Sequence, residues 1–267
     1  MLTDLARGTL RSAHQKLIPI TDELPAQTSA ASPPRKPLAS KLHLAGFIAI
    51  QASLITMGFI DPSWYMRLTY AVLNLETCSA VSVHAILYLA MIPFDCALLA
   101  YCWLGVRISG GSLGSLSGAR WTSWKDLAVD YGDAILFWIV LLGVNAVALH
   151  LLGPESVDYS SILPKAMPEI FAWIAVSIAA SFCEEIVFRG YFQQQLHFLT
   201  GNLPLSILFQ GVVFGLAHSY QGWRSTIVIC FIGVLLGMFA ALRKNLRANI
   251  ILHGWVDIWE GWLKFIV

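Results

Sequence analysis

Charged residues are scarce in this sequence. Asp, Glu, Lys and Arg make up 12% of its 267 residues, whereas hydrophobic residues make up 57%. A soluble domain carries about 25% charged residues, so the composition predicts an integral membrane protein. The net charge is only +1, and no basic patch is interleaved with aromatic residues, so we expect no nucleic-acid partner.

Two common cysteine and histidine patterns are also missing. No CxxC pair occurs among the five cysteines, most of which lie within apolar runs. This favours small packing residues over disulfides or metal ligands. The sequence contains no HExxH, which excludes the usual zinc site of soluble metalloproteases.

Long apolar runs begin after Lys41. A membrane-spanning helix needs about 20 largely apolar residues, and the runs predict an all-α, polytopic helical bundle with about seven transmembrane helices. The expected spans are residues 42–60, 82–106, 134–152, 169–188, 203–218, 225–242 and 248–265. Residues 64–80 are ambiguous, because Arg67 and Glu76 favour an interfacial helix while the length leaves an eighth span open.

The amino-terminal part of the chain differs in composition. Residues 1–40 include a stretch rich in Pro, Ala and Ser and show no apolar period, which predicts a disordered arm. Residues 41–160 are predicted to form transmembrane helices of unassigned role. Most of the 17 Lys and Arg residues fall on one side of the membrane if the amino terminus is cytoplasmic. The positive-inside rule therefore predicts a cytoplasmic amino terminus, with residues 181–190 at the cytoplasmic end of their span.

Three charged residues lie at the end of the apolar run that starts at residue 169. Each of Glu184, Glu185 and Arg189 would cost about 2.5–3.5 kcal/mol at bilayer depth on insertion scales. Glu185 and Arg189 are four residues apart, so on a helix they share a face and can pair. Glu184 is rotated by about 100° from Glu185. We therefore expect that the two carboxylates do not face the same partner and that Glu184 is available for chemistry.

Two further apolar runs carry polar residues at helical spacing. Phe214 and His218 are four apart in FGLAH, and His253 and Asp257 are four apart in HGWVD. Taken singly, each has a structural explanation, such as a hydrogen-bonded histidine or a carboxylate that fixes one tautomer. Together with Glu184, these groups satisfy one another only if they converge on one interior site, and we predict that they do.

Three short sequences, EEIVFR, FGLAH and HGWVD, follow one another on successive apolar runs. They match the EExxxR, FxxxH and HxxxN/D motifs of the CPBP family, which includes type II CAAX prenyl endopeptidases and bacterial bacteriocin-processing or immunity proteins. The chain resembles this family over its carboxy-terminal part. The resemblance implies that residues 161–267 form a catalytic transmembrane core.

The resemblance implies an intramembrane endopeptidase that opens to the cytoplasm and acts on a peptide or membrane-protein substrate, CAAX-like or bacteriocin-like. We expect its place to be the inner membrane of a bacterium. Peptide hydrolysis needs a base for the water and a group that stabilises the oxyanion. We expect Glu184 and His218 to activate the water, His253 to stabilise the oxyanion and Asp257 to position it. Supporting roles are expected for Glu185, Arg189 and Phe214.

Asp257 stands where the family motif often has Asn. An ionised carboxylate would repel an oxyanion, so Asp257 is expected either to act in its protonated form or to orient His253. The family has been described both as glutamate-type peptidases and as metalloproteases. A metal-free, glutamate-type reaction is favoured here, and a zinc ion held by Glu184, His218 and His253 is the alternative.

Two other functions remain open from the sequence. One is a non-catalytic membrane protein that binds a hydrophobic partner or confers immunity. The other is a proton-coupled transporter, although the inverted repeats that mark many transporters are not visible. The substrate and the oligomeric state have no signature in the sequence.

Two weaker features concern helix packing. Gly211 with Gly215, and Gly233 with Gly237, have GxxxG spacing and predict close helix packing within the chain. Asp95 lies two residues after Pro93 in an apolar run. It is interpreted as the cap of a helix break at the proline, with the lining of a substrate passage as the alternative.

Overall fold

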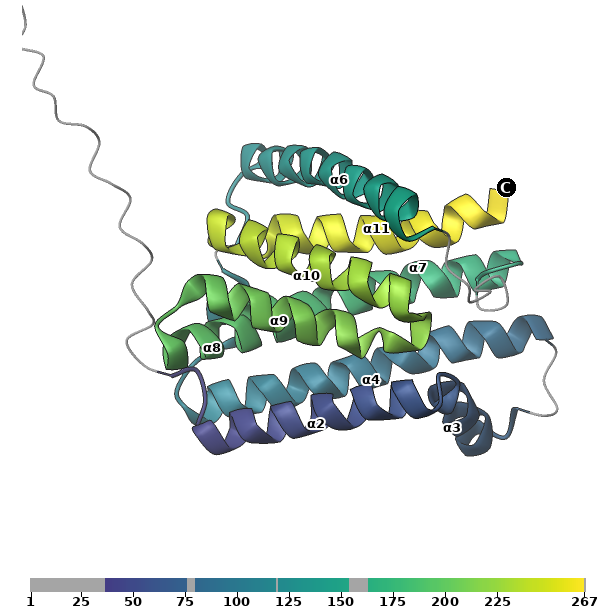
Figure 1. Ribbon diagram of the computed structural model, residues 1–267, viewed down its shortest axis with the longest axis horizontal. Coiled ribbons are helices and arrows are strands. Elements are labelled where there is room, and N and C mark those ends of the chain that lie inside the picture. Colours follow the sequence, from purple (N-terminus) through teal and green to yellow (C-terminus); the bar gives the residue numbers. More distant parts are fainter. Residues whose placement is uncertain (1–36, 76–79, 119, 154–162, 267) are drawn as a thin grey trace, which may run out of the picture. The chain divides into compact units, whose positions relative to one another are not determined.

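The computed structural model describes residues 37–75, 80–118, 120–153 and 163–266, which belong to one compact unit of the chain. Every regular element in these ranges is a helix (Figure 1), which confirms the predicted all-α class. The elements are α2 (Lys41–Ile60), α3 (Trp64–Leu73), α4 (Ala80–Ile108), α5 (Leu113–Ser117), α6 (Trp124–Leu152), α7 (Met167–Glu184), the π-helix η3 (Glu185–Phe192), α8 (Gln193–Thr200), α9 (Leu203–Ala217), the 3₁₀ turn η4 (Ser219–Gln221), α10 (Trp223–Arg243) and α11 (Arg247–Ile266).

Five helical runs in these ranges are long and apolar enough to cross a membrane. They are α2, α4, α6, the continuous run α7–η3–α8 and α10. The chain is therefore an integral membrane helical bundle. α9, over the span expected at residues 203–218, is apolar but has only 15 residues, fewer than the about 20 that a span needs. α3, within the ambiguous segment 64–80, has ten residues and ends at Leu73, fewer than the about 20 that a span needs; residues 76–79 of that segment lie outside the described ranges.

One predicted helix boundary is wrong. α6 begins at Trp124 and not near residue 134, because Ser123 and Asp126 form a capping box at its amino terminus. The acidic residues Asp130 and Asp133 lie in the part of α6 that precedes residue 134. In the structure they form ion pairs with Arg243 at the end of α10, so they are tolerated inside the helix.

The four glycines with GxxxG spacing lie where α9 and α10 pack against each other. A Cβ atom on Gly233 would lie 2.9 Å from the carbonyl oxygen of Gly211, and one on Gly215 would lie 2.5 Å from the backbone nitrogen of Cys230. Contacts this short leave no room for a side chain. The predicted close packing within the chain is confirmed.

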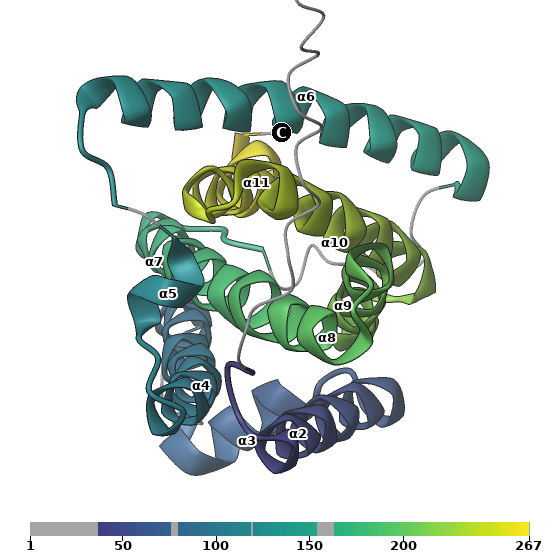
Figure 2. The same cartoon turned by 90° about the vertical axis from the view of Figure 1, so that its left-hand side faces the viewer.

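Contacts between helices bring the polar residues together. α7 packs against both α4 and α11, and α10 packs along α9. Figure 2 shows α7, α10 and α11 in this arrangement, with α6 on the outer side of α10 and α11. The helices that carry the three motifs thus meet in one region.

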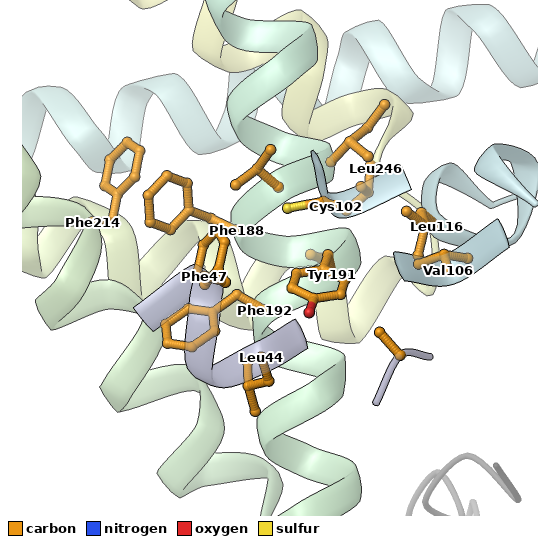
Figure 3. Close-up of a cluster of buried hydrophobic side chains, with 14 residues drawn as sticks. Leu44, Phe47, Cys102, Val106, Leu116, Phe188, Tyr191, Phe192, Phe214 and Leu246 are labelled. Atoms are coloured by element: carbon orange, nitrogen blue, oxygen red, sulfur yellow. The ribbon is translucent and has the colours of Figure 1, made fainter. Parts of the chain in front are cut away.

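The π-helix η3 lies at the centre of the largest apolar cluster. All eight of its residues are buried. Phe47 of α2 packs against it, with ring centroids 5.0 Å from Phe192 and 5.5 Å from Tyr191 (Figure 3). In a membrane, where lipid is as apolar as the side chains, such contacts stabilise through van der Waals packing. The amino-terminal helices therefore hold η3 in place.

Some predictions lie at the edge of the described residues. The predicted arm, residues 1–40, falls almost entirely outside them, and so does Cys78. Of the other four cysteines, Cys102 and Cys183 are buried, as predicted for packing residues, whereas Cys230 is partly exposed and Cys96 is exposed.

Candidate active site

The first motif lies at a change of helix type. α7 continues without interruption into η3, and the change from α-helix to π-helix falls between Glu184 and Glu185. Both residues keep helical backbone angles. π-helical turns are rare in proteins, and those that occur are often found at functional sites. The sequence gives no signal for this change.

Glu185 and Arg189 form the predicted ion pair. Nη1 of Arg189 lies 3.0 Å from Oε1 of Glu185, and both side chains are fully buried. Arg189 also donates to the carbonyl oxygen of Gly233 at 3.4 Å. Its guanidinium group lies 4.2 Å from the ring centroid of Phe214, a distance at which a cation is attracted to the ring face. Phe214 therefore covers the ion pair.

Glu185 has two further partners. Nδ1 of His253 lies 2.9 Å from Oε1 of Glu185, and Nδ2 of Asn249 donates to Oε2 at 3.2 Å. Asn249 also donates to the carbonyl oxygen of Leu236 at 2.9 Å. Both oxygens of Glu185 are thus occupied by donors from η3 and α11. This network fixes the orientation of His253.

The contact of Asn249 with Glu185 was not predicted from the sequence. Asn249 precedes His253 by four residues, which places both on one face of α11. That spacing was the only available signal, and it was weak because a single Asn in an apolar helix often only bonds to a backbone carbonyl.

Glu184, unlike Glu185, has few partners. Its side chain is 21% exposed, and its buried Oε2 atom has no hydrogen-bond partner. The same oxygen lies 3.8 Å from Nε2 of His253. Oε2 of Glu184 therefore makes only this long contact with the imidazole and no hydrogen bond.

One geometric expectation is wrong. Glu184 and Glu185 were expected to face different partners, but both approach His253, at Nε2 and at Nδ1 respectively. The two ring nitrogens lie on different edges of the imidazole, so one ring can be approached from two directions. Rotation about the helix axis separates the carboxylates without separating their partner.

Asp257 approaches the same nitrogen as Glu184. Its Oδ2 atom lies 3.7 Å from Nε2 of His253. The backbone carbonyl of Asp257 accepts a hydrogen bond of 2.8 Å from the indole of Trp173, which ties α11 to α7. Acceptors therefore face both nitrogens of His253, with Glu185 on one side and two carboxylates on the other.

His218 stands at the carboxy-terminal end of α9. Its Nδ1 lies 2.8 Å from the carbonyl oxygen of Phe214, and because a carbonyl only accepts, Nδ1 carries the hydrogen and Nε2 is left as an acceptor in the neutral ring. The ring stacks on Tyr220 of η4, with centroids 6.1 Å apart. The described contacts include no hydrogen bond or ion pair between His218 and Glu184.

Tyr220 was not predicted. Burial raises the pKa of its phenol to about 12, although a hydrogen bond from Gln221 acts against this. The phenol therefore keeps its proton at neutral pH. Its electrostatic interactions with Glu184 and Asp257 place it near the cluster.

A cavity of about 270 Å³ adjoins His218, His253 and Asp257. Its walls come mainly from apolar side chains of α6 and α10, including Leu141 and Ile232, and His218, His253 and Asp257 form part of its polar lining. The two histidines and Asp257 thus face one space. It can accept an apolar group beside polar, titratable side chains.

A catalytic zinc site needs about three protein ligands around one ion. Among the residues that the structure describes, no three His, Cys, Asp or Glu side chains are arranged so that they could hold a metal ion. The zinc alternative, with Glu184, His218 and His253 as ligands, therefore has no support in the placement of these side chains. The metal-free reaction stays a prediction.

Comparisons with known proteins agree with the motifs. A family model described as "Rce1-like: Type II CAAX prenyl endopeptidase Rce1-like" matches residues 166–259. The match begins just before α7, ends in α11 and contains all three motifs. A search of curated proteins and a search of solved structures found no match. The predicted resemblance is confirmed.

Proposed function

Since residues 166–259 belong to the Rce1-like family of type II CAAX prenyl endopeptidases, a protease family, we propose that Glu184 is the base of a metal-free peptide hydrolysis in the membrane. The substrate is a membrane-associated peptide or protein, CAAX-like or bacteriocin-like. One contrast supports this most: donors occupy both oxygens of Glu185, whereas the buried Oε2 of Glu184 has none. A base needs a free oxygen.

In the proposed reaction Glu184 takes a proton from a water molecule as the water attacks the scissile carbonyl. Nε2 of His218, an acceptor in the neutral ring, helps to orient the water. His253 acts here as the imidazolium: its Nδ1–H donates to Glu185, and its Nε2–H donates a hydrogen bond to the tetrahedral oxyanion. Glu185 holds Nδ1 of His253 at 2.9 Å, so the imidazole is fixed before the charge develops, which is what makes such stabilisation effective.

Two roles are assigned to the remaining polar residues. The sequence left open whether Asp257 orients His253 or acts when protonated. Because Glu185 already orients the ring, we assign the second role to Asp257, which then donates a hydrogen bond to the oxyanion. Glu185 and Arg189 neutralise each other and support His253.

The test uses purified protein in detergent and two kinds of probe, an S-farnesylated CAAX-type peptide and unmodified hydrophobic peptides, with both fragments identified by mass spectrometry. Glu184→Gln is expected to lower the cleavage rate by about 10²–10⁴, the usual effect of removing a base. Glu169→Gln is the matched control, because Glu169 is a buried glutamate on the same helix and its partners are Lys165 and His84. Cleavage by Glu184→Gln at the wild-type rate would refute the assignment.

We also propose that the amino terminus is cytoplasmic and that the protein resides in a bacterial inner membrane. The asymmetric placement of Lys and Arg supports this orientation. An amino-terminal epitope should be digested by added protease in inside-out vesicles and protected in intact cells. The reverse pattern would contradict the orientation.

A further inference from the structure

Asp95 is a buried acid outside the residues that match the family. It lies on α4, is 8% exposed, and its buried Oδ2 atom has no hydrogen-bond partner. The helix break expected at Pro93 does not exist, since α4 runs continuously from Ala80 to Ile108. Asp95 is therefore not a cap, and its burial needs another explanation.

The packing of α4 shows what Asp95 faces. Early in α4, Tyr88 packs against Trp173 of α7, with ring centroids 5.3 Å apart. Later in α4, Cys102 lies in one buried cluster with Ile186 of η3. Tyr88, Asp95 and Cys102 are separated by seven residues each, or two helical turns, so they share one face. Asp95 thus lies midway along the contact, opposite the carboxy-terminal end of α7.

A neighbouring contact fixes the same register. The thiol of Cys96 is hydrogen-bonded to the side chain of Cys183. Cys96 follows Asp95 directly, and Cys183 precedes Glu184 directly. Asp95 is therefore close enough to Glu184 for the two carboxyl groups to interact electrostatically, and Asp257 and His253 lie within the same range.

Other titratable groups also face Asp95. They are Cys183 of α7, Tyr65 of α3 and Tyr220 of η4, in addition to His253 and Asp257 of α11. Of these, only His253 can carry a positive charge, and Glu185 already holds its Nδ1. Two carboxyl groups that face each other in a water-poor site do not both ionise readily, so such a pair tends to share one proton.

We propose that Asp95 is the general acid of the reaction and forms a proton-sharing pair with Glu184. This inference rests on the proposed function. Glu184 takes a proton from water as the water oxygen bonds to the scissile carbon. Asp95 then gives its proton to the amide nitrogen as the C–N bond breaks, and the amine leaves with the bonding electron pair. A proton passes from Glu184 to Asp95 and restores the pair.

The test compares two leaving groups on the same acyl sequence: the scissile amide of an S-farnesylated CAAX-type peptide, and a 4-nitrophenyl ester. An amine must be protonated to leave, whereas 4-nitrophenolate leaves without a proton. Asp95→Asn is expected to lower amide cleavage by about 10² or more and to leave ester cleavage within about threefold of the wild type. Glu184→Gln should lower both rates, because both reactions need activated water.

The ratio of the amide rate to the ester rate does not depend on how much of a variant is folded, so it is informative even for a poorly folding variant. Asp95→Glu keeps a carboxyl group and should recover part of this ratio. Cys96→Ser, next to Asp95 on the same helix, should keep the wild-type ratio.

Two results would overturn the assignment: amide cleavage by Asp95→Asn at the wild-type rate, or an equal loss on both substrates, which indicates a structural role. A wild-type protein that cleaves neither substrate would instead refute the proposed function itself.

Discussion

α6 and the run α7–η3–α8 are both long and apolar enough to cross a membrane, but protein covers them to different extents. Within the most apolar 18 residues of each run, the buried share is 6% in α6 and 50% in the run from Met167 to Thr200. α6 has its acidic residues near its amino-terminal end, where Asp130 pairs with Arg243 and Arg247. The other run carries Glu184 and Glu185 well within its length.

The difference shows what hydropathy does and does not report. Both runs have the composition of a span, so composition predicts that they enter the membrane. Which one is enclosed by other helices depends on small and polar residues that pack against neighbours. Polar groups deep in an apolar run are tolerated only where partners reach them, as Asn249 and His253 of α11 reach Glu185 in η3.

The largest expected effect concerns the buried ion pair of η3. Arg189→Met should lower the free energy of unfolding by about 3–5 kcal/mol, because it leaves Glu185 buried without its counter-ion. Chemical unfolding in mixed detergent micelles measures this. A loss below about 1 kcal/mol would mean that the pair behaves like a surface salt bridge.

A second comparison places one apolar truncation in each region. Ile186 of η3 is fully buried, whereas Leu136 of α6 is 65% exposed. Ile186→Ala should cost about 2–5 kcal/mol, because it leaves a cavity, while Leu136→Ala should change the unfolding free energy by no more than about 0.5 kcal/mol. Equal costs in the same micelles would contradict the difference in enclosure.

A smaller effect is expected at the polar end of α6. Asp130 is buried and pairs with two arginines, and it also accepts from the indole of Trp121 at 2.7 Å. Asp130→Asn should cost about 1.5–3 kcal/mol, the usual contribution of hydrogen bonds to charged groups. Arg243 keeps Asp133 as a partner, which limits the loss. The thermal unfolding midpoint should fall accordingly, with cleavage activity preserved below it.

The sequence predicted the elements of the site better than their contacts. Spacings of four residues correctly placed Glu185 with Arg189 and His253 with Asp257, because helical geometry alone determines which side chains share a face. That both glutamates reach His253 depends on the packing of α7 against α11, which spacing within one helix does not contain.

The features that were predicted wrongly or missed also depend on contacts between helices. Pro93 suggested a helix break, but a proline inside a helix is tolerated in membrane proteins where other groups compensate for the lost hydrogen bond. What Asp95 faces depends on the contact between α4 and α7, and spacing within one helix does not contain that contact. The π-helix of η3 depends on tertiary packing and has no local pattern.

The central claim is that two adjacent glutamates have separate roles, one in stability and one in chemistry. The most direct test measures the free energy of unfolding of Glu184→Gln and Glu185→Gln in the same micelles. We predict that Glu184→Gln stays within about 0.5 kcal/mol of the wild type, and that Glu185→Gln loses about 3–5 kcal/mol because Arg189 is left buried and uncompensated. Equal losses in the two variants would contradict the claim.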